Sequence, residues 1–298
     1  MEKSFDIPIL FIIFNRPNTT IRVFNQIKKI KPKKLYVVAD GARNNKEGED
    51  SKCNEVRGII NSIDWDCEVF KNYSEINLGC KNRLSSGISW FFENEEMGII
   101  LEDDCLPDIS FFYFCKELLI KHKDNERIGM ISGNNFQFGK IKNEYSYYFS
   151  KYSHIWGWAT WRRAWKKYDV NMKKWPLLRK KISSVLPNIF DTVYWKIIFD
   201  DVYKGKIDTW DYQWTFTCFI NNYLSIIPSI NLVSNIGFCQ KNATHTQRIN
   251  KFSNMKMSSI NFPLSHPKTI EDDKRSDKII RWQNYPLWKL IIKKILIK

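Results

Sequence analysis

The chain has 298 residues, 43% of them hydrophobic, and carries a formal net charge of +15. The hydrophobic share excludes a disordered chain, and the length allows one large core or one core with a small appendage. The positive charge favours anionic partners such as nucleic acid, phosphorylated small molecules or an acidic membrane surface, but it does not choose among them.

The first 130 residues alternate short apolar runs with segments of helical periodicity. In chain order, we expect a strand at 7–14, a helix capped by Asn18 or Thr19, a strand at 35–39, a helix over 53–63, a strand at 68–70, a helix over 84–92, a strand at 98–101, a helix over 111–118 and a strand at 128–132. This rhythm predicts an α/β fold with a mostly parallel central sheet and helices on both faces. Ligands bind such sheets beyond the carboxyl ends of the strands.

From about residue 145 the pattern changes to aromatic-rich segments. Trp158, Trp161 and Trp165 have helical spacing, which predicts core packing for most of that stripe. Residues 232–238 look like a strand, and 250–276 read as a polar loop. We therefore expect one α/β domain over 1–255 and a C-terminal wrap with a basic amphipathic tail over 256–298.

The location of the protein is predicted from its cysteines and apolar runs. Seven scattered cysteines without a Cys-x-x-Cys pair argue against a zinc knuckle or a redox dithiol, and we expect reduced thiols in a cytoplasmic protein. The run 7–14 contains Pro8 and lacks a cleavage site, so a buried strand is favoured over a signal peptide. The tail 279–298 pairs apolar residues with lysines, which suits either a peripheral helix on an anionic inner membrane or a helix docked on the core.

Three adjacent carboxylates, Glu102, Asp103 and Asp104, follow directly on the apolar strand 98–101. Such neighbours repel one another unless a cation or hydrogen-bond donors offset them. A divalent metal bound to phosphate oxygens would do so, and all-oxygen ligation favours Mn²⁺ or Mg²⁺. The alternative is a solvated acidic turn, but the position after a buried strand favours the metal site.

The segment 100–108, Ile-Leu-Glu-Asp-Asp-Cys-Leu-Pro-Asp, resembles the Glu-Asp-Asp segment of the N-acetylglucosaminyltransferase I family and of related bacterial nucleotide-diphospho-sugar transferases. The resemblance continues in order through most of 7–250. Its further segments are Phe14-Asn15-Arg16, Val38-Ala39-Asp40, Asn77-Leu78-Gly79 with Arg83, His154-Ile155-Trp156-Gly157-Trp158 and Trp210-Asp211-Tyr212-Gln213-Trp214.

The resemblance implies a GT-A type, Rossmann-like fold and sugar transfer from a nucleotide-diphosphate donor, with UDP favoured, to a glycan or lipid-linked acceptor. It implies that Asp104 ligates the metal while Glu102 and Asp103 help to hold the ribose and the donor sugar. The other implied contacts to the nucleotide sugar are Arg16, Asp40 for the uracil, Arg83, and the loop of Trp156, Gly157 and Trp158 around the sugar. The family often closes its metal site with a late His, which makes His245 a second candidate ligand, although a lone loop His is more often solvated.

Asp211 is the candidate catalytic base by the same resemblance, which implies inversion at the anomeric carbon. The relatives often carry a second acid beside it, whereas here Tyr212 follows. The neighbouring residues Trp210, Tyr212 and Trp214 also favour a base at this position. Aromatic neighbours desolvate a carboxylate, which raises its pKa and makes it a better base. The alternative, an aspartate that caps a helix starting at Tyr212, is compatible with that role.

Two other functions fit parts of the sequence. A nucleic-acid-binding module would use the charge and the aromatics, but no RNA-recognition signature, zinc spacing or basic heptad helix supports it. A sugar nucleotidyltransferase has a similar fold but carries a glycine-rich phosphate loop after the first strand, where this chain has Asn15-Arg16-Pro17-Asn18.

Overall fold

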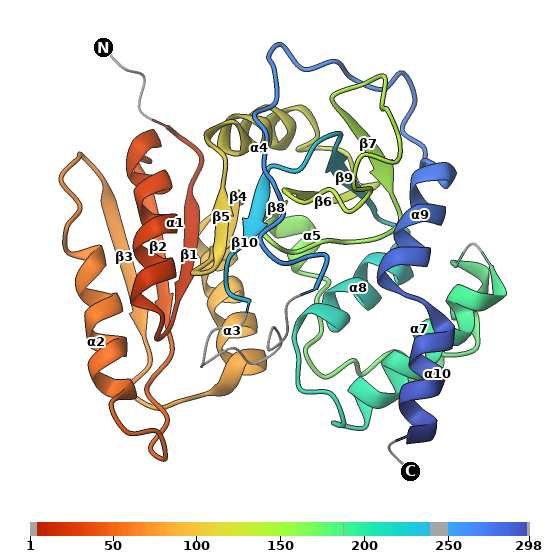
Figure 1. The fold of residues 1–298 in the computed structure, drawn as a ribbon, viewed down its shortest axis with the longest axis horizontal. Helices are drawn as coiled ribbons and strands as arrows, with labels where there is room; N and C mark the ends of the chain where they lie inside the picture. Colours follow the sequence, from red (N-terminus) through yellow and green to blue (C-terminus); the bar gives the residue numbers. More distant parts are fainter. Residues whose placement is uncertain (1–4, 187, 239–249, 297–298) are drawn as a thin grey trace.

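The computed structural model describes residues 5–186, 188–238 and 250–296 (Figure 1). The strands are β1 Ile9–Ile13, β2 Lys34–Ala39, β3 Glu68–Tyr73, β4 Met97–Glu102, β5 Cys105–Pro107, β6 Ile128–Ser132, β7 Tyr147–Ser150, β8 Trp158–Trp161, β9 Leu224–Pro228 and β10 Val233–Asn235. The helices are α1 Pro17–Ile30, α2 Glu49–Ile60, α3 Gly79–Asn94, α4 Ile109–Lys121, α5 Arg162–Trp165, α6 Trp175–Leu178, the 3-10 helix η1 Lys181–Ser184, α7 Ile189–Tyr203, α8 Asp211–Ile220, α9 Lys274–Asn284 and α10 Leu287–Leu296.

The central sheet has eight strands in the order β3-β2-β1-β4-β8-β6-β9-β7. Strands β3, β2, β1 and β4 are parallel to one another, as are β6 and β9. Strand β8 runs antiparallel between β4 and β6, and β7 is antiparallel at the edge beside β9. The predicted α/β fold with a mostly parallel sheet is confirmed.

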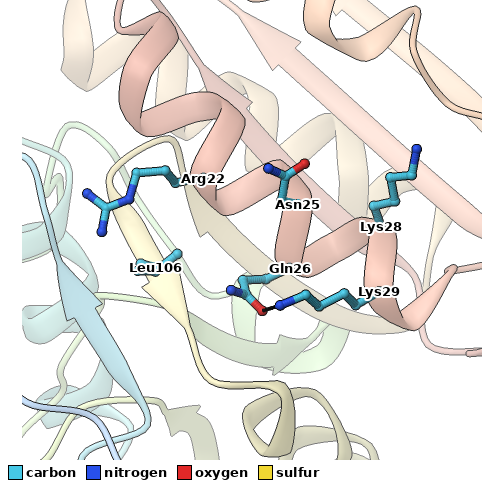
Figure 2. Close-up of a pocket in the computed structure, with 6 residues that line it drawn as sticks. All are labelled: Arg22, Asn25, Gln26, Lys28, Lys29 and Leu106. Carbon is cyan, nitrogen blue, oxygen red and sulfur yellow. Dashed lines mark hydrogen bonds between the residues drawn. The ribbon is translucent and has the colours of Figure 1, made fainter.

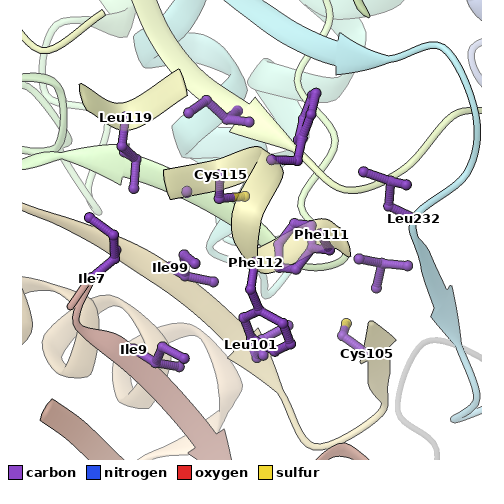
Figure 3. Packing of buried hydrophobic residues seen from close by; sticks show 14 of the residues in the cluster. Ile7, Ile9, Ile99, Leu101, Cys105, Phe111, Phe112, Cys115, Leu119 and Leu232 are labelled. Atoms are coloured by element: carbon purple, nitrogen blue, oxygen red, sulfur yellow. The ribbon is translucent and has the colours of Figure 1, made fainter. Parts of the chain in front are cut away.

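The two faces of the sheet are covered by different helices, because side chains alternate along each strand. Ile9, Phe11 and Ile13 of β1 belong to a cluster that also contains the apolar faces of α1, α2 and α4. Leu10 and Ile12 belong to a second cluster with residues of α3, α5 and α8. Figure 3 shows the first cluster where Phe111, Phe112 and Cys115 of α4 pack over Ile99 and Leu101 of β4.

A third cluster, around Trp195 and Phe199 of α7, joins Tyr148 of β7 and Ile227 of β9 to residues of α6, α8 and α9. It lies in the region at the right of Figure 1. The C-terminal segment contributes to more than one cluster: Ile260 and Leu264 pack in the first, and Ile280 of α9 in the third. In the described residues, no helix is long and apolar enough to cross a bilayer. Six cysteines in this part of the chain are free thiols, and four of them are buried.

Two expectations about local structure were wrong. Helix α1 begins at Pro17 with Arg16 as N-cap, rather than at a cap on Asn18 or Thr19, because proline is favoured at the first helical position. The tryptophans at 158 and 161 belong to strand β8, and Trp165 ends the short helix α5. Their helical spacing misled because every residue of β8 is buried, so the strand has no polar alternation.

Candidate active site

The acidic triplet lies in the tight turn that joins β4 to β5. Glu102 ends β4, and Asp103 and Asp104 form the turn with 6% and 8% exposure. Strand β5 then pairs with β10, and the carbonyl of Asp104 accepts a hydrogen bond from the amide of Ile236 at 2.8 Å. The pairing fixes the turn at the carboxyl end of the parallel strands, where the sequence predicted a site.

Arg16 reaches the triplet from the end of the neighbouring strand β1. Its guanidinium Nη1 lies 2.5 Å from Oδ2 of Asp104 and 3.5 Å from Oδ1 of Asp103. The backbone amide of Phe14 also donates to Oδ2 of Asp103, at 3.1 Å. Four of the predicted site residues, Arg16 and the three carboxylates, are therefore brought together around adjacent strand ends.

The carboxylates outnumber the cations in this cluster. Burial raises the pKa of Asp103 to about 7, against the attraction of Arg16. Burial also raises the pKa of Glu102 well above its ordinary value, with the charges of its two acidic neighbours adding to the shift. One guanidinium does not offset three ionised carboxylates, so Glu102 and Asp103 retain protons toward neutral pH, and an added cation would favour their ionised forms.

Gly237 is a member of the site that sequence reasoning missed. A Cβ built on it would lie 2.8 Å from Cβ and 2.9 Å from Cγ of Asp104, and would overlap the carboxylate oxygen. Only a glycine lets the chain after β10 lie against this carboxylate. The position lies in the strand-like run 232–238, but nothing local distinguishes it, because the contact joins residues that are far apart in the sequence.

Asp40 and Arg83 shape the loops after β2 and β3. The Asp40 carboxylate accepts hydrogen bonds from the amides of Leu78 at 2.9 Å and Gly79 at 3.1 Å. Arg83 donates to the carbonyl of Ala39 at 3.0 Å and lies buried at 5% exposure. Both side chains are thus engaged with the backbone of this chain, and contact to a nucleotide stays a prediction for them.

A second network that the sequence did not reveal lies beside Phe14. Glu49, at 4% exposure, accepts from Asn15 Nδ2 at 2.8 Å and from Arg43 Nε at 2.9 Å. The guanidinium of Arg43 lies over the Phe14 ring, 5.7 Å from its centroid. Although burial acts in the opposite direction, the hydrogen bonds from Arg43 lower the pKa of Glu49. The network holds the loop after β2 against the end of β1.

The two tryptophans of the segment Trp156-Gly157-Trp158 lie in different surroundings. Gly157 has a φ of 65° and packs against Val233 of β10. The half-buried Trp156 ring lies edge-on to Phe238, with 5.7 Å between centroids, just after Gly237. Trp158 is 1% exposed and stacks on Trp210 at 5.8 Å. Trp156 is therefore near the acidic cluster, whereas both faces of the sugar-stacking candidate Trp158 lie within the core.

Asp211 lies at the start of α8, the helix whose residues Trp214 and Cys218 pack in the second cluster. Helix α8 begins at Asp211 itself with Trp210 as N-cap, so the helix starts one residue earlier than the capping alternative assumed. The Thr209 hydroxyl donates to the Asp211 carboxylate. The charge of Asp211 contributes to raising the pKa of Glu102, after burial and the other two acids, so the two carboxylates lie within electrostatic range of each other.

The metal-ligand prediction stays a prediction. His245 lies outside the described residues. Within 5–186, 188–238 and 250–296, no group of three or more His, Cys, Asp or Glu side chains is arranged to hold a metal ion. Asp104 can still supply a carboxylate oxygen, and Mg²⁺ in proteins commonly uses one or two carboxylates plus phosphate oxygens and water. The residues fit a metal whose coordination is completed by a diphosphate.

A surface hollow of about 570 Å³ lies elsewhere, between α1 and β5. Figure 2 shows its lining: Arg22, Asn25, Gln26, Lys28 and Lys29 from α1, and Leu106 from β5. Lys28 already pairs with Asp64 at 2.7 Å, and Lys29 donates to Gln26 at 3.3 Å. The hollow contains none of the predicted site residues, and its lysines have partners, so it is not the candidate active site.

Comparison with known proteins gives only remote likenesses. No family model and no curated protein matches the chain. Among solved structures, HddC from Yersinia pseudotuberculosis is 7% identical, with 54% of this chain and 80% of that chain covered and a TM-score of 0.34. A cytidylyltransferase from Leptospira borgpetersenii is 13% identical over 68% and 72%, with a TM-score of 0.33. Mouse xyloside xylosyltransferase 1, in its apo form, is 10% identical over 72% and 81%, also with a TM-score of 0.33. Likenesses this weak carry no argument about the reaction of this chain.

Proposed function

We propose that this chain is a metal-dependent, inverting glycosyltransferase that moves a sugar from a nucleotide-diphosphate donor to a hydroxyl of a glycan or lipid-linked acceptor. The observation that carries the proposal is the meeting of Arg16 and the acidic turn at the ends of β1 and β4, with Asp211 of α8 within electrostatic range of Glu102. Displacement of a diphosphate by a hydroxyl requires a cation and carboxylates beside the leaving diphosphate and a separate carboxylate beside the attacking hydroxyl.

The donor diphosphate is expected beside Arg16 and Asp104. The guanidinium offers several N–H donors in a planar fork, which suits phosphate oxygens, and its present partner Asp104 would be shared with a Mn²⁺ or Mg²⁺ ion. When bound, that ion would neutralise the charge that develops on the leaving diphosphate. The family resemblance adds UDP as the favoured nucleotide and Asp40 and Arg83 as its neighbours.

The transfer itself assigns one role to Asp211. As the acceptor hydroxyl oxygen forms its bond to the anomeric carbon, the bond from that carbon to the diphosphate oxygen breaks, and the hydroxyl proton passes to the Asp211 carboxylate. Attack from the side opposite the leaving group inverts the anomeric centre. The hydrogen bond from Thr209 would hold the carboxylate in a fixed orientation for that step.

Two features argue against the alternatives. The connection from β1 to α1 is Phe14-Asn15-Arg16, without the glycine-rich loop that a sugar nucleotidyltransferase uses for triphosphate. A nucleic-acid groove would not place three carboxylates where the phosphate backbone must pass, because like charges repel.

The test is Asp211→Asn, which keeps the shape of the side chain and removes the base. Turnover, measured as release of nucleoside diphosphate with a panel of nucleotide sugars and acceptors, should fall by roughly 10²–10⁴, while donor affinity by calorimetry stays near wild type. Asp208→Asn is the matched control, because it makes the same change on an exposed residue three positions earlier. If Asp211→Asn turns over at the wild-type rate, Asp211 is not the base; if no nucleotide sugar binds wild type, the proposed function is wrong.

A further inference from the structure

Exposed apolar side chains are concentrated on the helices of the C-terminal half of the chain. Nine of the sixteen large apolar side chains that are exposed among the described residues lie on α6, α7, α9 and α10. They are Leu177, Ile189, Phe190, Tyr203, Trp282, Trp288, Ile291, Ile292 and Ile295. Single exposed apolar residues are normal, but a concentration of them marks an interaction surface.

Helix α10 has apolar side chains on two sides, and only one side packs against the rest of the protein. Its inner side chains, Leu287 and Leu290, pack against the third cluster next to α7. A second apolar stripe points away: Trp288 is 54% exposed, Ile292 48% and Ile295 67%. These three residues are spaced by four and three positions and so share one side of the helix. The outer stripe adds nothing to the core and is free to contact another surface.

The ion pair between Arg281 of α9 and Asp191 of α7, at 3.6 Å, brings the end of α9 against the start of α7. Exposed Trp282 and Phe190 adjoin the two members of this pair in sequence. Helix α10 then continues along α7, as Figure 1 shows. Exposed apolar side chains of α7 and α9 therefore accompany the outer stripe of α10 in the same region of the molecule.

The charge of this region indicates what covers it. From Lys278 to Lys298 the sequence has six Lys or Arg residues and no Asp or Glu. Lys289 is exposed and its ammonium lies over the Trp288 ring, 5.3 Å from the centroid. Tryptophans and isoleucines flanked by lysines suit the boundary between the headgroups and acyl chains of an anionic bilayer, where the apolar side chains are buried and the cations meet lipid phosphates.

We infer that the outer face of α10, together with the exposed side chains of α7 and α9, docks on the surface of an anionic lipid bilayer. The helix would lie in the plane of the interface with Trp288, Ile292 and Ile295 inserted and Lys289 among the headgroups. The inference does not depend on the proposed reaction, because none of these residues belongs to the candidate active site.

Co-sedimentation with vesicles tests the inference on the full chain. Wild type should sediment with vesicles of equal parts phosphatidylglycerol and phosphatidylcholine, less at higher salt, and much less with phosphatidylcholine alone. The double variant Ile292→Ser with Ile295→Ser should bind about tenfold or more weakly. The matched control is Ile120→Ser with Ile76→Ser, since these side chains are 51% and 68% exposed elsewhere on the molecule and should leave binding unchanged.

Equal unfolding midpoints of the two double variants and wild type would establish that folding is intact. Absence of wild-type sedimentation with the anionic vesicles would overturn the inference, as would equal loss of binding in both double variants. Binding to immobilised polyglutamate that matches binding to vesicles would also overturn it, and would favour an acidic protein partner.

Discussion

Gly237→Ala is the substitution that most directly tests the geometry of the acidic turn. A methyl group at this position would lie 2.8 Å from Cβ of Asp104, whereas carbon atoms in contact normally lie at least about 3.5 Å apart. The overlap involves Cβ, whose position rotation about χ1 does not change, so the backbone of the β4–β5 turn or of the segment after β10 must move by about 0.7 Å. We expect a loss of stability of about 1–3 kcal/mol, as for other overpacked sites.

The same movement would disturb the 2.5 Å contact between Arg16 and Asp104. If that contact positions the donor, turnover should fall by about a hundredfold, the usual effect of misplacing catalytic groups by an ångström. Urea unfolding and nucleoside diphosphate release measure the two effects. Gly58→Ala serves as the control: the site is an exposed helical position with nothing within 4 Å of the added methyl, so stability should rise by about 0.5–1 kcal/mol. A Gly237→Ala variant that is as stable and active as wild type would refute the reasoning.

Two further predictions concern carboxylates. Asp104→Ala and excess chelator should each abolish donor binding in calorimetry. The control Asp108→Ala should only remove the N-cap of α4, at a cost of about 1 kcal/mol in stability. Undiminished donor binding in excess chelator would exclude the metal. Burial raises the pKa of Asp277 to about 7 from an ordinary value of 3.8, so in that range the folded state holds a proton that the unfolded state has lost, and stability should fall as pH rises from 4 to 7. Asp277→Asn should flatten the decline in thermal unfolding midpoint over this range, and an unchanged slope would show that Asp277 is not its source.

The N-terminal half of the fold could be predicted because its signals are local. Strand β1 is buried at every position, and α1 buries Val23, Phe24, Ile27 and Ile30 at helical spacing. The acidic turn was found in the same way, since its charges follow a buried strand directly. In the second half, strands β7, β8 and β9 are also buried throughout, but Ser150, Thr160 and Ser225 end or interrupt their apolar runs, so they lack both the continuous apolar run of β1 and a regular alternation.

The missed parts of the site depend on contacts between distant residues. Gly237 is special only because Asp104 lies against it, and Glu49 is buried only because Arg43 and Asn15 bind it. Trp156 and Trp158 are the same residue type but differ in burial. Trp158 is buried because it belongs to β8, which pairs with β4 inside the sheet, whereas Trp156 precedes the strand. Composition and spacing do not reveal these contacts, because they form only when the strands assemble into the sheet.

The insertion of β8 between β4 and β6 has a consequence for the order in which the chain can fold during synthesis. Strands β1 to β4 are complete once Glu102 has been made, and up to that point they can pair with one another in the order β3-β2-β1-β4. The other edge of β4 has no partner until Trp158–Trp161 follows, with β5, α4, β6 and β7 made in between. Until then an apolar strand presents unpaired amides and carbonyls, the kind of edge at which nascent chains associate with one another.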